Sequence, residues 1–346
     1  MQVRRPQQTG TKLPICLSNR KPSSNLCLDH LYLRALTLHA MTRQFRTLVS
    51  LTLATFLLAA CVTAPVVPVT QIPPTSIPPK PPKIALVLGG GAIRGFSHIG
   101  VIKVLQAEGI VPDMVVGTSA GSVAGALYAA GLSGYDMQTI AFDIDKATVM
   151  DWSIFSKGML KGEALQDFVN KAVGNKSIEN LKIPFACVAT RLDTGDAVLF
   201  QRGNVGTAVR ASSSVPGVFQ PVVIAGVEYV DGGLVSPVPI RYAKQMGADF
   251  IIAVDVSSPP SAAPTTGKVD VLMRTFDIMG KSIRAWESPM ADILVRPDLT
   301  KVSSTDIEAK HQAILEGERS MQAALPLLRE KLKQRMQPIG AVVAAP

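Results

Sequence analysis

The alternation of apolar runs with amphipathic stretches predicts an α/β fold with a largely parallel central sheet flanked by helices. Two runs, 84–88 and 250–256, are almost continuously apolar, as expected of strands that are buried on both faces. The predicted strands 84–88 and 114–116 are each followed by a glycine-containing turn and then by a helical pattern. This repeated order of strand, turn and helix is typical of α/β proteins.

The same patterns predict the remaining elements in chain order. Helices are predicted at 98–107, 122–130, 268–285 and 310–334. Further strands are predicted at 184–190 and 197–200, and in a hairpin formed by 222–224 and 227–230. Residues 132–182, with Trp152, Phe155 and Met159, are predicted to form either a lid facing the substrate or an ordinary helical cap.

The N-terminal part of the chain has the pattern of a secreted lipoprotein. Residues 41–60 combine two arginines with a short apolar stretch, which is typical of a signal peptide and short for a membrane span. The ending Leu-Ala-Ala-Cys at 58–61 resembles a bacterial lipobox and predicts lipidation of Cys61. The alternatives are an ordinary signal peptide with an incidental cysteine, or a short membrane anchor.

The domain boundaries follow from this interpretation. Residues 1–40 are expected to be a non-native extension read from an upstream start codon. Residues 61–82 carry the lipidated cysteine and a Pro-rich run that favours a semi-rigid polyproline spacer. The main folded domain is expected at 83–300, and a C-terminal helix and tail at 301–346. Some inner-membrane lipoproteins carry aspartate directly after the lipidated cysteine, and this chain has Val62 there. The expected location is therefore the periplasmic face of the outer membrane.

The formal charge of +9 does not indicate a nucleic-acid partner. Residues 1–61 hold eight of the 35 basic residues and one of the 26 acidic residues, which leaves 27 basic and 25 acidic residues beyond Cys61. Of the four cysteines, only Cys187 lies in the folded part, where a buried thiol is the default interpretation. No Cys/His cluster has the spacing of a metal site, and neither a metal nor a cofactor is expected.

A Gly-x-Ser-x-Gly turn at 117–121 stands between a predicted strand and a predicted helix. This is the context of a nucleophile elbow, in which Gly117 and Gly121 permit a sharp turn and leave Ser119 uncrowded. The serine oxygen would then lie near a helix N-terminus, which favours developing negative charge. Ser119 is the candidate nucleophile; the alternative is a glycine-rich packing turn with a serine N-cap.

A second glycine-rich loop, 89–95, also follows a strand and precedes a helix. Its backbone N–H groups are candidates for an oxyanion site. A phosphate-binding P-loop would need Gly-Lys-Ser/Thr after the spacer, and a dinucleotide fingerprint would need glycine at position 94, which is Arg94. Nucleotide binding is therefore disfavoured.

The base that activates Ser119 has two kinds of candidate. A Ser-Asp-His order would use His311, but this residue sits in a charged segment with the pattern of a solvated helix face. Asp231 ends a predicted strand and is followed by Gly232 and Gly233, which allow a sharp turn and a close approach to another loop. A partly desolvated carboxylate there could have a raised pKa and act as the base. An aspartate that only shapes the turn is the alternative.

Taken together and in this order, the glycine-rich loop, the serine turn and Asp-Gly-Gly resemble the bacterial patatin-like phospholipase family. The resemblance spans residues 83–255 and is carried by the segments 88–101, 116–122, 211–221 and 237–239. It implies a patatin-like three-layer fold and a Ser–Asp dyad without histidine, with Ser119 as nucleophile and Asp231 as base. It also implies that Gly89, Gly90, Gly91 and Arg94 line the oxyanion region. His98 would be structural or a neighbour of the site.

The implied activity is hydrolysis of lipid acyl esters of the phospholipase A or lysophospholipase type, through an acyl-enzyme. The sequence departs from the family pattern at Ala92 and Ile93, where glycine and a small residue are usual. If position 92 needs a positive φ, alanine strains the loop by about 1 kcal/mol or more. A catalytically weak or silent envelope lipoprotein, and a His-assisted esterase, therefore stay open. The sequence does not indicate an oligomeric state.

Overall fold

The structure is a computed structural model that describes residues 80–144, 162–257, 267–302 and 306–336. These residues contain one sheet of eight strands in the order β5-β6-β3-β2-β1-β7-β8, and β4 pairs with β3 off this path. In chain order the strands are β1 (Ile84–Leu88), β2 (Met114–Thr118), β3 (Phe185–Arg191), β4 (Ala197–Phe200), β5 (Val222–Ile224), β6 (Val227–Asp231), β7 (Phe250–Val254) and β8 (Ile293–Val295).

The centre of the sheet is parallel and one side of it is antiparallel. Strand β1 pairs in parallel with β2 and β7, β2 with β3, and β7 with β8. Strands β4 and β6 run antiparallel to β3, and the β5–β6 hairpin turns at Ala225 and Gly226. The predicted α/β class with a largely parallel sheet is confirmed.

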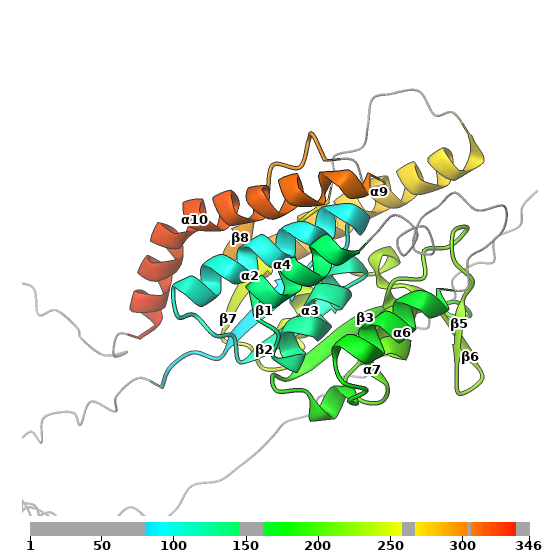
Figure 1. Cartoon of the computed structure of the whole chain (residues 1–346), viewed down its shortest axis with the longest axis horizontal. Helices are drawn as coiled ribbons and strands as arrows, with labels where there is room; N and C mark the ends of the chain where they lie inside the picture. Colours follow the sequence, from blue (N-terminus) through cyan, green and yellow to red (C-terminus); the bar gives the residue numbers. More distant parts are fainter. Residues whose placement is uncertain (1–79, 145–161, 258–266, 303–305, 337–346) are drawn as a thin grey trace, which may run out of the picture. The chain divides into compact units, whose positions relative to one another are not determined.

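Helices cover both faces of the sheet and make three layers (Figure 1). The α-helices are α2 (Ser97–Ala107), α3 (Ala120–Ala130), α4 (Gly134–Asp143), α6 (Glu163–Ala172), α7 (Val205–Ser212), α8 (Ile240–Gln245), α9 (Lys268–Glu287) and α10 (Lys310–Arg335). Short 3-10 turns are η1 (Ala92–Phe96), η2 (Ile178–Asn180), η3 (Gly232–Leu234), η4 (Ser288–Met290) and η5 (Ile307–Ala309).

Strand β1 shows why the central run of the sheet is apolar throughout. Successive side chains of a strand point to opposite faces. Leu86 and Leu88 pack into the core on the side of α2, α3 and α10, whereas Ala85 and Val87 pack into the core on the side of α8. Both sets are fully buried. The continuous apolar run therefore results from two cores that share one strand.

Helix α10 belongs to the same compact unit as the sheet. It runs alongside α2 (Figure 1), and Ile314, Met321 and Leu328 contribute to the core. The two helices approach closely at Gly317, where a Cβ atom would lie 2.0 Å from the carbonyl oxygen of Ser97. The domain boundary expected at residue 300 stays a prediction; the helix expected at 310–334 is present and packs into the same core as the sheet.

Three short elements, α7, α8 and β8, were not predicted from the sequence. The region 132–182 contains α4 and α6, and residues 145–161, with Trp152, Phe155 and Met159, lie outside the described residues. The extension 1–40, the signal peptide 41–60, Cys61 and almost all of the Pro-rich spacer also lie outside them. In the part of the chain that the structure describes, no helix has the length and apolar character needed to cross a membrane.

Candidate active site

Ser119 occupies a sharp turn between β2 and α3. Its backbone dihedrals are φ 53° and ψ −125°, a combination that non-glycine residues rarely adopt. Strand β2 ends at Thr118 and α3 begins at Ala120, so the serine is the only residue between the two elements. Such strain persists where the surrounding structure enforces it, and it is common at active sites. The predicted nucleophile-elbow geometry is present.

The two glycines of this turn are required by close packing. A Cβ atom at Gly117 would lie 2.5 Å from the carbonyl oxygen of Gly121, and one at Gly121 would lie 2.0 Å from the carbonyl oxygen of Leu88. Neither position can carry a side chain without displacing the backbone. The glycines therefore allow α3 to start directly against β1 and β2, which presents Ser119 at the carboxyl end of the sheet.

The register of the sheet brings Asp231 to Ser119 across β3. Thr118 of β2 pairs with Val188 of β3, and Asp231 of β6 pairs with Ala189. Position 119 therefore lies level with Asp231, with one strand between them. Gly232 packs so tightly against β3 that a Cβ atom would lie 2.1 Å from the carbonyl oxygen of Val188. The Asp-Gly-Gly sequence predicted a close approach of this turn to another part of the chain. The packing of Gly232 against β3 is that approach, and it fixes the position of Asp231.

The carboxyl group of Asp231 is buried and has an unused acceptor. The residue is 6% exposed, and Oδ1 accepts a hydrogen bond of 2.6 Å from the amide of Gly233. No group in the described part of the chain makes an aligned hydrogen bond to Oδ2. Burial raises the pKa of Asp231 to about 6, although the Gly233 amide and the nearby Ser119 hydroxyl favour the ionised form. The carboxylate can therefore accept a proton near neutral pH.

Two serines that sequence reasoning did not single out hold this pair in place. The amide of Ser119 donates to Ser212 Oγ at 3.0 Å, and Ser212 Oγ donates to the carbonyl oxygen of Val188 at 2.6 Å. The amide of Asp231 donates to the carbonyl oxygen of Ser214 at 2.9 Å. The signal in the sequence was the run of three serines at 212–214, which closes α7.

The glycine-rich loop lies over the serine but offers fewer amides than expected. A Cβ atom at Gly90 would lie 3.1 Å from Ser119 Cβ. However, the amide of Gly89 donates to Val254 O at 3.0 Å and that of Gly90 to Pro237 O at 2.9 Å. These two amides cannot also bind an oxyanion, so the expectation for Gly89 and Gly90 needs correction. Among the described residues, no hydrogen-bond partner is found for the amide of Gly91, the N-cap residue directly before η1.

Ala92 and Arg94 complete this loop. Ala92 has φ 51°, so the position where the family usually carries glycine does adopt the conformation that favours glycine. Arg94 Nε donates a 3.4 Å hydrogen bond to the carbonyl oxygen of Gly91, in the same loop. Burial lowers the pKa of Arg94, and Asp277 on α9 counteracts this. In this conformation Arg94 braces the loop, whereas the sequence predicted that it lines the oxyanion region.

Neither histidine contacts the dyad within the described residues. His98 Nε2 lies 2.8 Å from the carbonyl oxygen of Gly89, and burial lowers the pKa of this imidazole to about 4. The ring is neutral, and we assign its proton to Nε2 because a carbonyl oxygen only accepts. His311 is exposed on α10 and packs on Phe142, with ring centroids 4.2 Å apart. His98 therefore supports the loop, and the His311 triad is not supported.

Cys187 belongs to the core of the sheet. The Cys187 thiol is buried in β3, and burial raises its pKa, as expected of a core cysteine. No group of three or more His, Cys, Asp or Glu side chains within the described ranges is arranged to hold a metal ion.

A family model described as "Patatin-like phospholipase" matches residues 86–244. This range contains the serine turn, the glycine-rich loop and Asp231. The chain carries a patatin-like phospholipase domain. Its relatives include an uncharacterized NTE family protein of Mycobacterium bovis, 35% identical over 207 residues, which are 59% of this chain and 57% of the relative.

Two further comparisons concern larger proteins. The patatin-like domain is similar to the mouse patatin-like phospholipase domain-containing protein 6, with 32% identity over 235 residues, which are 64% of this chain and 16% of the mouse protein. The crystal structure of VipD from Legionella pneumophila matches with a TM-score of 0.47 and 16% identity, covering 71% of this chain and 67% of that one. The chain therefore spans 57% of the length of the mycobacterial relative and 16% of the length of the mouse protein.

Proposed function

We propose that this protein is a serine hydrolase that cleaves lipid acyl esters of the phospholipase A or lysophospholipase type. The observation that carries the proposal is the pairing of two unusual groups. Ser119 stands in a strained turn, and Asp231 faces it from the same level of the sheet with a buried carboxylate oxygen that has no aligned partner among the described residues. The family of the domain supports a lipid as substrate.

The proposed reaction has two stages. Ser119 Oγ attacks the ester carbonyl while Asp231 Oδ2 takes the hydroxyl proton, and the collapse of the tetrahedral intermediate releases the alcohol, which takes that proton. Water then attacks the acyl-enzyme and gives a proton to Asp231. Asp231 returns this proton to Ser119 Oγ as the bond to the acyl group breaks and the fatty acid leaves. The amide of Gly91, which has no hydrogen-bond partner within the described ranges, supports stabilisation of the oxyanion, as does the N-terminus of α3.

The proposal is tested with a fluorophosphonate probe and with hydrolysis of a phospholipid, a lysophospholipid and a short p-nitrophenyl ester. We expect labelling and hydrolysis in the wild type and neither in Ser119→Ala. Asp231→Asn should lose turnover while it still folds. Ser282→Ala, which changes an exposed serine of α9, is the matched control and should behave as the wild type. Equal labelling of Ser119→Ala and the wild type would refute the assignment.

A second function, binding without catalysis, is favoured by one observation. Ala92 occupies a left-handed conformation in the loop over Ser119, and two amides of that loop are already paired. A protein with this loop could bind an acyl lipid and hydrolyse it slowly or not at all. Ser119-dependent turnover of the short ester would exclude this alternative, whereas lipid binding without turnover would establish it.

We also propose that the domain is tethered to the envelope by a lipid on Cys61, at the periplasmic face of the outer membrane. The support is the signal-like segment before the cysteine and the Pro-rich spacer after it. Such a tether would hold the dyad close to a phospholipid surface. Full-length protein should fractionate with membranes, and Cys61→Ala should not; equal membrane association of both proteins would contradict the tether.

A further inference from the structure

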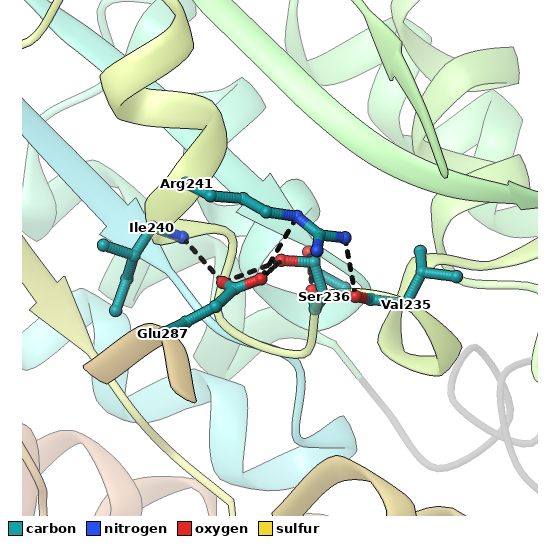
Figure 2. Close-up of polar contacts among 6 residues, drawn as sticks. Val235, Ser236, Ile240, Arg241 and Glu287 are labelled. Atoms are coloured by element: carbon teal, nitrogen blue, oxygen red, sulfur yellow. Dashed lines mark hydrogen bonds and ion pairs between the residues drawn. The ribbon is translucent and has the colours of Figure 1, made fainter. Parts of the chain in front are cut away.

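A buried carboxylate lies at the C-terminal end of α9. Glu287 is 0% exposed, and Figure 2 shows its contacts. Ser236 Oγ lies 2.9 and 3.0 Å from its two carboxylate oxygens, and the amide of Ile240 donates to Oε2 at 3.2 Å. Arg241 Nε lies 3.3 Å from Oε1. The carboxylate thus holds both ends of the segment 236–240.

This segment provides carbonyl oxygens to both catalytic loops. The carbonyl oxygen of Ser236 accepts a 2.8 Å hydrogen bond from Thr118 Oγ1, directly before the nucleophile. The carbonyl oxygen of Pro237 accepts the 2.9 Å bond from the amide of Gly90. The amide of Ser236 donates to the carbonyl oxygen of Gly232 at 2.9 Å, next to Asp231. One segment therefore connects the serine turn, the glycine-rich loop and the Asp-Gly-Gly turn.

Stability alone is a weak reason for a carboxylate in this place. Burial of an ionised group is costly unless it is fully paired, and an apolar replacement for a buried ion pair is often neutral or stabilising. Burial raises the pKa of Glu287, and the Ser236 hydroxyl opposes this most strongly, ahead of Arg241. What the carboxylate adds over an apolar side chain is direction, because its two oxygens accept from a side chain and a backbone amide at fixed positions.

We propose that Glu287 is a positioning residue for the reaction proposed above: it fixes residues 236–240, and these hold Thr118 and Gly90 where Ser119 and the oxyanion amides are aligned. The bond from Gly90 to Pro237 sets the orientation of the peptide unit that leads into Gly91. Glu287 makes no contact with Ser119 or Asp231 among the described residues, so it acts on the reaction through the segment. The inference rests on the proposed hydrolase function.

The first test compares Glu287→Gln with a matched variant directly before the first residue of β8. Asp292→Asn is the control, because Asp292 likewise accepts from a backbone amide, that of Ile251 at 2.8 Å, and pairs with an arginine, Arg335 at 3.0 Å. We expect Glu287→Gln to lower kcat for the short ester about 10- to 100-fold with KM changed less than twofold, as for a small misplacement of reacting groups. Asp292→Asn should keep the wild-type kcat.

The second test does not depend on catalysis. Amide hydrogen exchange in the full-length protein should become faster in Glu287→Gln for the peptides that contain Gly90 and residues 236–240, and should not change there in Asp292→Asn. Unchanged exchange in these peptides would overturn the inference, even if no ester were hydrolysed. Absence of Ser119-dependent hydrolysis in the wild type, in contrast, would count against the proposed function alone.

Ser236→Ala keeps the experiment decisive if Glu287→Gln does not fold. This variant removes one partner of the carboxylate and leaves the bond to the Ile240 amide. It should show the same pattern to a smaller degree: lower kcat, unchanged KM and faster exchange around Gly90. Ser236→Thr, which restores a hydroxyl, should recover most of the loss. Wild-type kcat and exchange in Ser236→Ala, or a loss that appears only in KM, would contradict a positioning role.

Discussion

The carboxyl group of Asp231 shows how the environment of one residue prepares it for chemistry. In the part of the chain that the structure describes, it accepts one aligned hydrogen bond, from the Gly233 amide, and burial raises its pKa to about 6. A base must be ionised to accept a proton, so the carboxylate gains this ability as the pH rises through 6. The usual pKa of an aspartate, about 4, would make it a weaker base.

We therefore predict that kcat/KM for the short ester rises with pH around an apparent pKa near 6 and is level above it. Ser119 does not titrate in this range, so the rise reports Asp231. The measurement is a pH–rate profile of the wild type between about pH 4.5 and about pH 8, a range that covers the titration of Asp231. A profile that is already level at pH 5 would show that a group with a lower pKa acts as the base.

The raised pKa of Asp231 also predicts that ionisation of this carboxyl group destabilises the folded protein. The folded pKa is higher than the unfolded value of 3.8, so the folded protein is favoured while Asp231 is protonated and loses stability as pH rises from 4 to above 6. The loss is about 3 kcal/mol or less at pH 7. Asp231→Asn should therefore gain stability relative to the wild type at pH 7 and not at pH 4, as measured by urea unfolding at both values.

At the scale of elements, the loop between β1 and α2 combines strain with support. Ala92 has φ 51°, and His98 and Arg94 hold the carbonyl oxygens of Gly89 and Gly91. Ala225, in the exposed β5–β6 hairpin, has nearly the same φ of 50°. These two alanines share a backbone conformation, but only Ala92 lies in the loop over Ser119.

We predict that Ala92→Gly and Ala225→Gly each stabilise the protein by about 1 kcal/mol or less, because relief of left-handed strain exceeds the entropy cost of glycine by a small margin. Only Ala92→Gly should change turnover, with a rise below about 10-fold, since Ala92 already adopts the required φ. Urea unfolding and kcat for the short ester check both parts. A rise of about 100-fold or more would mean that Ala92 disables an oxyanion donor.

At the scale of the whole folded unit, α10 completes the core that supports the catalytic loops. Ile314, Met321, Leu325 and Leu328 are buried against the rest of the domain. Each such side chain contributes about 1.5–3 kcal/mol on burial, so the four contribute about 6–12 kcal/mol. This is comparable with the total stability of a typical domain, about 5–15 kcal/mol.

We predict that truncation after Val302 abolishes cooperative thermal unfolding, whereas truncation after Met336 leaves Tm unchanged. The first removes the four side chains of α10, and the second removes none of them. Circular dichroism melting of both truncated proteins beside the full chain is the measurement. Cooperative unfolding of the shorter protein near the wild-type Tm would show that α10 is dispensable.

The features predicted correctly from sequence are those whose cause lies in neighbouring residues. The strain at Ser119 needs only a buried strand, two glycines and the start of a helix within 114–122. Asp231 was recognisable because Gly232 and Gly233 follow it directly. The parallel strands were recognisable because burial on both faces requires an apolar residue at every position. The short α7, α8 and β8 lack such a local pattern, and they were missed.

The remaining features depend on partners far apart in the chain. Gly90 is paired with Pro237, Ser119 with Ser212, and Glu287 with Ser236. A backbone amide looks the same in a sequence whether it is free or paired. The sequence could therefore not show that the amides of Gly89 and Gly90 are occupied, nor that the amide of Gly91 has no partner in the part of the chain that the structure describes. Nothing near Glu287 marks it as different from the other charges of an amphipathic helix. Its role depends on burial and on the segment that the fold brings to it, and these exist only after the sheet has assembled.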